Sequence, residues 1–255
     1  MPKPKPAGRP PKYSRREILN AILDLVREGC TWRALPQDFP PYRIVFHYFR
    51  VWQKDGTWEK IHAALRQQVR QAAGKSRRPT TGIVDSQTVK TTEPGGPRGY
   101  DGGKRSAGVQ RGKKVRGRKR HLVVDTLGVV WGLVVTPASV PDWDGAWEVL
   151  LGAKRASPRW VRVFADSALA AIVFWAVWFV RVAVLLVRKA TGQKGLVVQS
   201  KRWIVERTFG WLKRYRRLAK DQERTIGSST AWVSVAMIPV LVRRLTPSPA
   251  FWTGS

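Results

Sequence analysis

Three carboxylates in this chain stand in apolar settings, where an acidic side chain is costly. Asp85 and Asp166 each follow a hydrophobic run, and Glu206 lies inside an amphipathic stretch. Burying a carboxylate is unfavourable unless a cation offsets its charge. Three carboxylates from separate elements could hold two Mg²⁺ ions, which activate an attacking oxygen and stabilise the leaving oxygen of a phosphoryl displacement. Taken singly, each of the three could instead be a helix cap or a member of an ion pair. A fourth carboxylate, Asp142, is expected to cap the N-terminus of a helix.

The charge balance indicates a polyanionic partner. The chain has 47 Lys and Arg against 17 Asp and Glu, a formal net charge of +30. Basic side chains bind nucleic acid by releasing counterions from its phosphates, although a basic, solvated surface is the alternative. Cys30 is the only cysteine, so no disulfide framework forms within one chain. That and the lack of a secretory signal in residues 1–12 lead us to expect a cytoplasmic, nucleoid-associated protein.

The N-terminal third predicts helices. Residues 1–13 form a flexible basic arm, and residues 14–74 form a small all-α domain. Helices are expected at 14–28, where Ser14 and Glu17 make a capping-box pattern, and at 42–54 and 58–73. Their basic faces suit a helix-turn-helix-like DNA-binding module, with Arg43 and Arg50 among its contacts, whereas a plain helical bundle is the alternative.

Beyond a polar linker, the pattern changes to alternating strands and helices over residues 81–246. Strands are expected at 81–88, 120–125, 129–136, 160–165 and 182–187, with helices at 142–151, 168–179, 203–218 and 228–245. A hairpin combined with βαβ-type crossovers predicts an α/β domain with a mixed sheet flanked by helices.

Residues 100–120 are rich in Gly, Lys and Arg and have no hydrophobic period, so we predict a DNA-contacting loop. Its proposed contacts are Lys113, Lys114, Arg116, Arg118, Lys119 and Arg120.

Residues 168–187 are almost wholly apolar and long enough to cross a membrane. The β-branched run at 182–187 favours a buried helix followed by a buried strand instead. We therefore expect no stable membrane association.

Several segments closely resemble IS5-type members of the IS4/IS5 superfamily of bacterial insertion-sequence transposases. In the N-terminal region they are Gly29–Pro36 (GCTWRALP) and Asp55–Trp58 (DGTW). In the remainder they are Asp85–Glu93 (DSQTVKTTE), Gly95–Asp101 (GGPRGYD), Gly117–Asp125 (GRKRHLVVD) and Val205–Leu212 (VERTFGWL). The resemblance extends from about residue 14 to residue 245.

The resemblance implies an RNase H-like domain with a DDE triad, which by residue match is Asp85, Asp166 and Glu206. These residues would bind two Mg²⁺ ions, with Mn²⁺ as a substitute. Arg202, Glu206 and Lys213 fit the R-x3-E-x6-K part of the family signature and lie on one helical stripe, where the two basic groups could hold a DNA phosphate.

The implied function is that of a DNA transposase. It would bind the terminal inverted repeats of its element, cleave DNA with a metal ion and join the ends to target DNA, as a homodimer on double-stranded DNA. The turn after Asp166 (Ser167-Ala168-Leu169) and Gln199, at the signature's tyrosine position, depart from the family pattern. The alternative is therefore a catalytically impaired remnant that only binds DNA.

Overall fold

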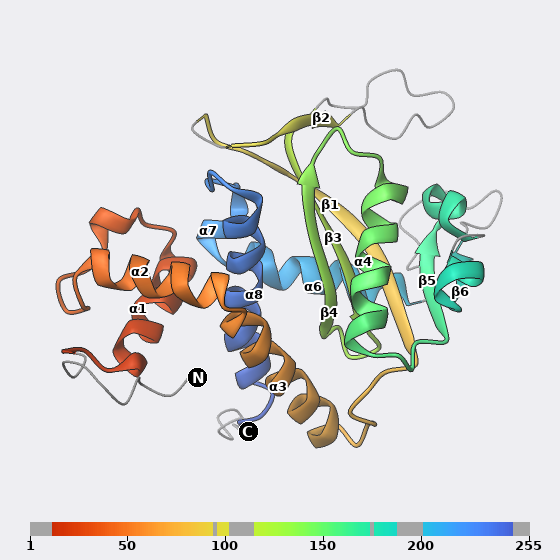
Figure 1. Ribbon diagram of the computed structural model, residues 1–255, viewed down its shortest axis with the longest axis horizontal. Coiled ribbons are helices and arrows are strands. Elements are labelled where there is room, and N and C mark those ends of the chain that lie inside the picture. The colour runs from red at the N-terminus through yellow and green to blue at the C-terminus, as the bar shows by residue number, and fades with distance from the viewer. Residues whose placement is uncertain (1–11, 94–95, 102–114, 174–175, 188–200, 247–255) are drawn as a thin grey trace, which may run out of the picture. The chain divides into compact units, whose positions relative to one another are not determined.

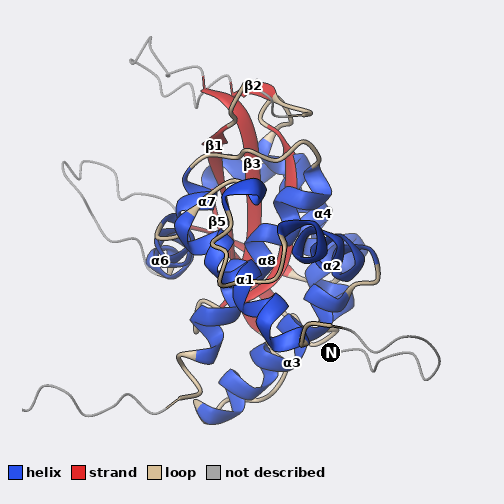
Figure 2. Cartoon of the chain, turned by 90° about the vertical axis from the view of Figure 1, so that its left-hand side faces the viewer, coloured by secondary structure: helices blue, strands red, loops and turns tan. Residues whose placement is uncertain are grey.

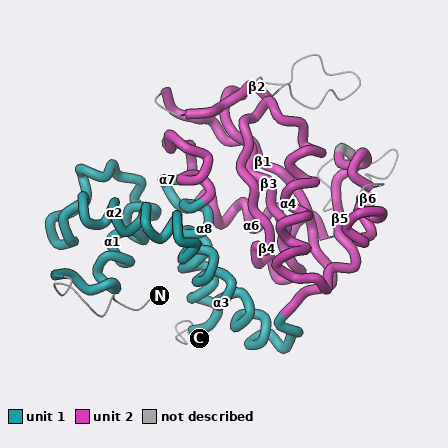
Figure 3. Tube along the Cα trace, viewed as in Figure 1, with its two compact units in different colours: residues 1–77, 214–218, 231–255 teal, residues 78–213, 219–230 magenta. Residues whose placement is uncertain are grey.

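A computed structural model describes residues 12–93, 96–101, 115–173, 176–187 and 201–246 (Figure 1). The chain divides into two compact units (Figure 3). Unit 1 contains the chain up to Arg77, Arg214–Leu218, and the chain from Ala231 onward; unit 2 contains Arg78–Lys213 and Ala219–Thr230. The predicted boundary between residues 74 and 81 lies near the first division, but unit 1 also takes up two C-terminal segments.

Unit 1 begins with the helices that the sequence predicts. They are α1 (Arg15–Glu28), the 3-10 helix η1 (Trp32–Ala34), α2 (Tyr42–Lys54) and α3 (Thr57–Ala72). Both bonds of the predicted capping box are present: Glu17 N donates to Ser14 Oγ at 3.2 Å, and Ser14 N donates to Glu17 Oε2 at 2.8 Å. Gly29 ends α1 with φ 74°, a left-handed conformation that glycine adopts without strain.

An aromatic cluster explains why the C-terminal segments join unit 1. Trp232 comes from α8 (Ile226–Val242), whose first turns belong to unit 2. Its ring stacks on Phe49 at a centroid distance of 4.4 Å and lies 5.6 Å from Trp32. The Arg217 guanidinium lies 4.4 Å from the centre of the Trp232 ring and donates to the Cys30 carbonyl at 2.9 Å. Buried aromatic area and cation–π contact therefore link residues far apart in sequence.

Unit 2 contains a single mixed sheet. Its strands are β1 (Thr81–Lys90), β2 (Gly99–Asp101), β3 (Val115–Asp125), β4 (Val130–Pro137), β5 (Arg162–Asp166) and β6 (Ala183–Val187). The order is β4-β3-β1-β5-β6, and β2 also pairs with the first residues of β3. The β4-β3-β1 part is antiparallel, whereas β1-β5-β6 is parallel. This is the strand arrangement of an RNase H-like domain, so the predicted fold class is confirmed.

Helices cover the sheet of unit 2. The helix α4 (Asp142–Ala156) packs on β3 and β4, and α6 (Arg202–Lys213) packs on β1 and β3. The two helices lie on opposite faces of the sheet (Figure 2). Coverage of both faces explains why β3 is buried at every position from Gly117 to Asp125.

Two helix predictions for the second half of the chain are wrong. Residues 168–179 do not form one buried helix: the described parts are a 3-10 helix, η2 (Ser167–Ile172), and a π-helical turn, η3 (Ala176–Val180). Trp178 and Phe179 are 71% and 61% exposed, so the hydrophobic run does not predict burial here. The helix expected at 203–218 ends at Lys213 and is followed by a short helix, α7 (Arg216–Ala219). Within the described ranges, no helix has the length and apolar character required to span a membrane.

Candidate active site

The sheet brings the first two candidate carboxylates to the same level. Ile83 of β1 is aligned with Phe164 of β5 in a parallel pair. Asp85 and Asp166 each lie two residues further along their strands. Because parallel strands advance together, the two residues are level with each other. Asp166 is the last residue of β5, whereas Asp85 lies midway along β1, two residues beyond the last residue that pairs with β5. Ligand sites in α/β sheets are common where parallel strands end.

The third carboxylate comes from α6, which packs on β1. This helix buries Ile204, Val205, Phe209 and Leu212 and leaves Glu206 largely exposed, at 61% for the side chain. The apolar face of α6 therefore faces the sheet, while Glu206 remains available to a ligand.

One guanidinium connects all three carboxylates. Arg202 Nη2 lies 3.4 Å from Asp85 Oδ2, and Nη1 lies 3.3 Å from Asp166 Oδ2. Nη2 also lies 3.9 Å from Glu206 Oε1, one helical turn away. The structure therefore brings the three predicted residues together around Arg202. The prediction that Arg202 holds a DNA phosphate did not include this pairing with the carboxylates.

Short hydrogen bonds orient the two aspartates. Ser86 N donates to Asp85 Oδ1 at 2.8 Å, and Ser167 Oγ donates to Asp166 Oδ1 at 3.0 Å. Ser86 Oγ also donates to Asp142 Oδ1 at 3.1 Å. The prediction that Asp142 caps α4 is wrong, because Pro141 occupies the N-cap position. The Asp142 side chain is instead tied to β1.

The carboxylates fit a divalent cation in their chemistry. Asp85 and Asp166 already share one cationic group, and hard carboxylate oxygens are the ligands that Mg²⁺ and Mn²⁺ accept. Mg²⁺ is bound through one or two carboxylates together with phosphates and waters, so this donor set is sufficient. Among the described residues, no three His, Cys, Asp or Glu side chains are grouped closely enough to enclose a metal ion by themselves. In this arrangement the guanidinium supplies the positive charge.

A cation–π stack on α6, which was not predicted from the sequence, helps to hold this helix in place. Arg207 lies between two tryptophans of its own helix, 4.6 Å from the centre of the Trp203 ring and 4.9 Å from that of Trp211. It also donates to the Leu127 carbonyl at 3.3 Å. The spacing of these three residues, i, i+4 and i+8, was a signal that could have revealed the stack. Burial lowers the pKa of Arg207.

A second link joins α6 to the turn between β3 and β4. Thr208 Oγ1 donates to the Gly128 carbonyl at 3.0 Å. Gly128 has φ 78°, and a Cβ there would lie 2.9 Å from Thr208 Oγ1. The hairpin turn and α6 therefore approach closely only with glycine at this position.

The predicted basic loop is partly a strand. Arg118, Lys119 and Arg120 lie in β3 and are 0%, 6% and 2% exposed. Arg118 Nη1 bonds to Asp221 Oδ1 at 2.8 Å, and Lys119 Nζ lies 3.1 Å from Asp142 Oδ1. The assignment of these three residues to DNA contact is therefore wrong, since all three side chains are buried inside unit 2. Their polarity predicted exposure, but Arg118 and Lys119 instead bind carboxylates and backbone carbonyls of the same unit.

The other predicted DNA contacts stay predictions. Arg116 is exposed and lies over the Tyr100 ring at 5.7 Å. Lys213 is exposed at the end of α6, Arg43 is exposed in α2, and Arg50 is half-buried in the same helix. Lys113, Lys114 and Gln199 lie outside the described residues.

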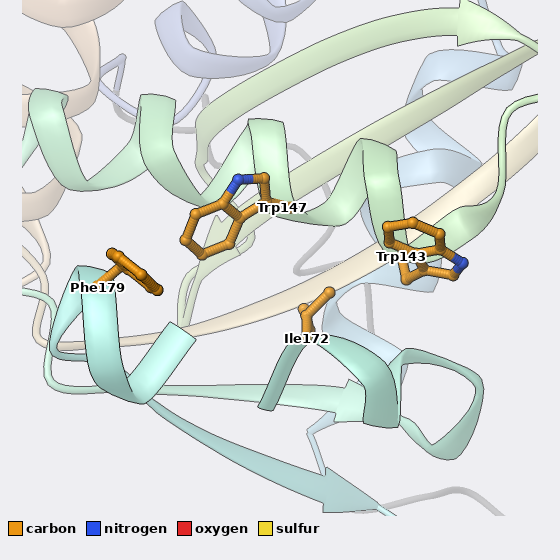
Figure 4. Close-up of a pocket in the computed structure, with 4 residues that line it drawn as sticks. All are labelled: Trp143, Trp147, Ile172 and Phe179. Atoms are coloured by element: carbon orange, nitrogen blue, oxygen red, sulfur yellow. The ribbon is translucent and has the colours of Figure 1, made fainter. Parts of the chain in front are cut away.

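An apolar cavity lies between α4 and the η2–η3 segment (Figure 4). It has a volume of about 570 Å³ and is lined by Trp143, Trp147, Ile172 and Phe179. It contains none of the candidate catalytic carboxylates. Its walls are almost entirely apolar, so it supplies packing surface and no acid–base group.

Two family models match the chain. Residues 76–241 match the family described as Transposase DDE domain, and residues 1–62 match the family described as Putative transposase of IS4/5 family. The chain belongs to the IS4/IS5 family of DDE transposases. The transposase matches solved structures at low identity: a pre-cleavage Mos1 transpososome (15% identity, TM-score 0.31) and a Mos1 mariner paired-end complex with Mn (15%, 0.29). Each alignment covers 95% of this chain and 81% of the other. These TM-scores are too low to inform the arrangement of this chain, and no match was found among curated proteins.

Proposed function

We propose that this transposase binds the terminal inverted repeats of its insertion sequence, cleaves DNA with divalent metal ions and transfers the cut ends to target DNA. The observation that carries the proposal is the gathering of Asp85, Asp166 and Glu206, from three separate elements, around one cationic group. A family of DDE enzymes provides the chemical context for such a cluster.

The proposed roles follow from position. Asp85 and Asp166, held by their serine hydrogen bonds, would be the main ligands of Mg²⁺ or Mn²⁺, and Glu206 would complete the set from α6. Bound ions would activate the attacking water or 3′-hydroxyl and stabilise the leaving oxygen. Lys213, exposed on the same helix as Glu206, would bind a phosphate of the DNA strand.

DNA affinity would depend mostly on charge. We propose Arg116, Arg43 and Arg50 as phosphate contacts from the described residues, together with Lys113 and Lys114. A formal charge of +30 predicts binding that weakens steeply as salt concentration rises. Two DNA ends must be processed together, so we further propose a homodimer on DNA, acting in the cytoplasm on the nucleoid.

The test is cleavage and strand transfer on duplexes that carry the element's own ends, with Mg²⁺ or Mn²⁺ and with EDTA. Asp85→Asn, Asp166→Asn and Glu206→Gln should each lower the cleavage rate by about 10³-fold or more, because each removes metal-borne stabilisation worth several kcal/mol. Asp144→Asn is the matched control, since Asp144 is an exposed carboxylate on α4, and it should cleave normally.

End binding by the variants should persist in a salt titration, which separates lost chemistry from lost folding. Full activity of Asp85→Ala would refute the triad. Salt-dependent end binding by the unmodified protein without any cleavage would instead favour the remnant that only binds DNA.

A further inference from the structure

The candidate site contains its own cation. The planar guanidinium of Arg202 presents its two terminal nitrogens to two different carboxylates. The third carboxylate, Glu206, lies 3.9 Å from one of these nitrogens. A group of negative charges that would otherwise repel one another therefore surrounds a single guanidinium.

Two arginine–carboxylate contacts in unit 2 differ in strength. Arg118 meets Asp221 at 2.8 Å with both side chains at most 1% exposed, the length of a strong charge-assisted bond. Arg202 meets its partners at 3.3 to 3.9 Å, with 15% of its side chain and 61% of Glu206 exposed. The first pair is fully buried at the length of a strong bond, whereas the Arg202 contacts are longer and its aspartate partners are 15% and 18% exposed. Longer contacts that water can partly reach are the easier ones to break.

A metal ion and Arg202 compete for the same oxygens. The Arg202 nitrogens lie 3.4 Å from Asp85 Oδ2 and 3.3 Å from Asp166 Oδ2. An ion bound to either oxygen at about 2.1 Å would therefore lie within about 5.5 Å of the nearer nitrogen. Even at the dielectric constant of water, repulsion between a divalent ion and a unit charge at that distance lowers affinity by about tenfold. Arg202 must therefore move away when the ion binds, or the ion binds weakly.

We propose that Arg202 is a built-in counter-ion, which occupies the carboxylate site in the free protein and leaves it for a DNA phosphate when divalent ions bind. This inference rests on the proposed function. Its consequence is coupling: DNA draws Arg202 off the carboxylates and so tightens metal binding, and by reciprocity metal ions tighten DNA binding. The free transposase would thus hold metal weakly and become competent on its DNA.

The test measures Mn²⁺ binding by electron paramagnetic resonance of the free ion, without DNA. Arg202→Gln should bind Mn²⁺ at least about tenfold more tightly than the unmodified protein, because the competing charge is gone. Arg155→Gln is the matched control: it removes one positive charge from an exposed side chain in the last turn of α4, outside the proposed site, and should change Mn²⁺ affinity less than threefold.

The coupling is measured by repeating the titration with a pre-cleaved end duplex, which offers no bond to hydrolyse. DNA should tighten Mn²⁺ binding several-fold in the unmodified protein and much less in Arg202→Gln. Circular dichroism establishes folding, and if Arg202→Gln does not fold, Arg202→Lys replaces it. A lysine has one compact ammonium and cannot bridge two carboxylates, so intermediate tightening is expected.

Weaker or unchanged Mn²⁺ binding by the folded variant would overturn the inference. If the unmodified protein cleaves its ends while the variant shows no tightening, only the counter-ion role is lost. If neither protein binds Mn²⁺ and no cleavage occurs with any divalent ion, the proposed function is lost as well.

Discussion

Replacing Arg118 with methionine tests whether β3 carries its basic residues for stability or for DNA. Arg118 is fully buried, and Nη1 contacts Asp221 Oδ1 at 2.8 Å. Nε and Nη2 donate to the carbonyls of Pro97 and Glu223, each at 2.9 Å. The side chain thus connects β3 to two loop segments, and the three acceptors to which it donates all lie inside unit 2.

The expected loss follows from what Asp221 retains. In Arg118→Met the Asp221 carboxylate keeps its hydrogen bonds from Ser229 Oγ and Glu223 N but loses its ion-pair partner while still buried. Breaking a buried pair on one side costs about 3–5 kcal/mol. Arg120 is a second positive charge near Asp221: burial lowers the pKa of Arg120 to about 10, and the Asp221 carboxylate opposes that fall. Because Arg120 still offsets part of the Asp221 charge in the variant, we expect a loss near the lower limit, about 3 kcal/mol.

The assay is urea unfolding followed by tryptophan fluorescence, in parallel with end-DNA binding at several salt concentrations. Arg118→Met should lower the unfolding midpoint without changing the slope of binding affinity against salt. Arg116→Met is the matched control, because Arg116 is exposed two residues earlier: stability should change by less than about 0.5 kcal/mol. If Arg118→Met were as stable as the unmodified chain and its salt slope fell by about one, the structural role of Arg118 would be refuted.

Three further outcomes are expected. Gly145→Ala should lower the free energy of unfolding by about 1–3 kcal/mol, because the new Cβ would lie 2.2 Å from His121 Nε2. Gly152→Ala, in the same helix but with open space around it, should raise the free energy of unfolding by about 0.5–1 kcal/mol in the same urea assay. Burial lowers the pKa of His121 from 6.5 to about 4, so between these pH values the unfolded chain binds a proton that the folded chain does not. Stability should therefore fall by about 2.5 kcal/mol between pH 7 and pH 4.5, and by less in His121→Asn, as measured by unfolding at these two pH values. Ser14→Ala should cost about 1 kcal/mol, and a thermal midpoint equal to that of the unmodified chain would contradict the role of the capping box.

The sequence determined those features that depend on neighbouring residues. The hydrophobic period predicted α1 and α2, and a capping box marked the start of α1. The helix predicted at 42–54 has the bounds Tyr42–Lys54 in the structure. The hairpin after β3 and the mixed sheet followed from strand patterns and turn residues. The resemblance selected Asp85, Asp166 and Glu206, and the structure places all three around one guanidinium.

Only the tertiary structure decided which charges meet. Arg118 and Asp221 are 103 residues apart in the chain, and nothing local distinguishes Arg118 from the exposed Arg116. The same holds for Arg202, whose charge suggested a DNA contact until the fold placed it 117 residues away in sequence against Asp85. An ion pair depends on which side chains are brought together and how far water is excluded, and both are properties of the packed sheet and helices rather than of the residue types.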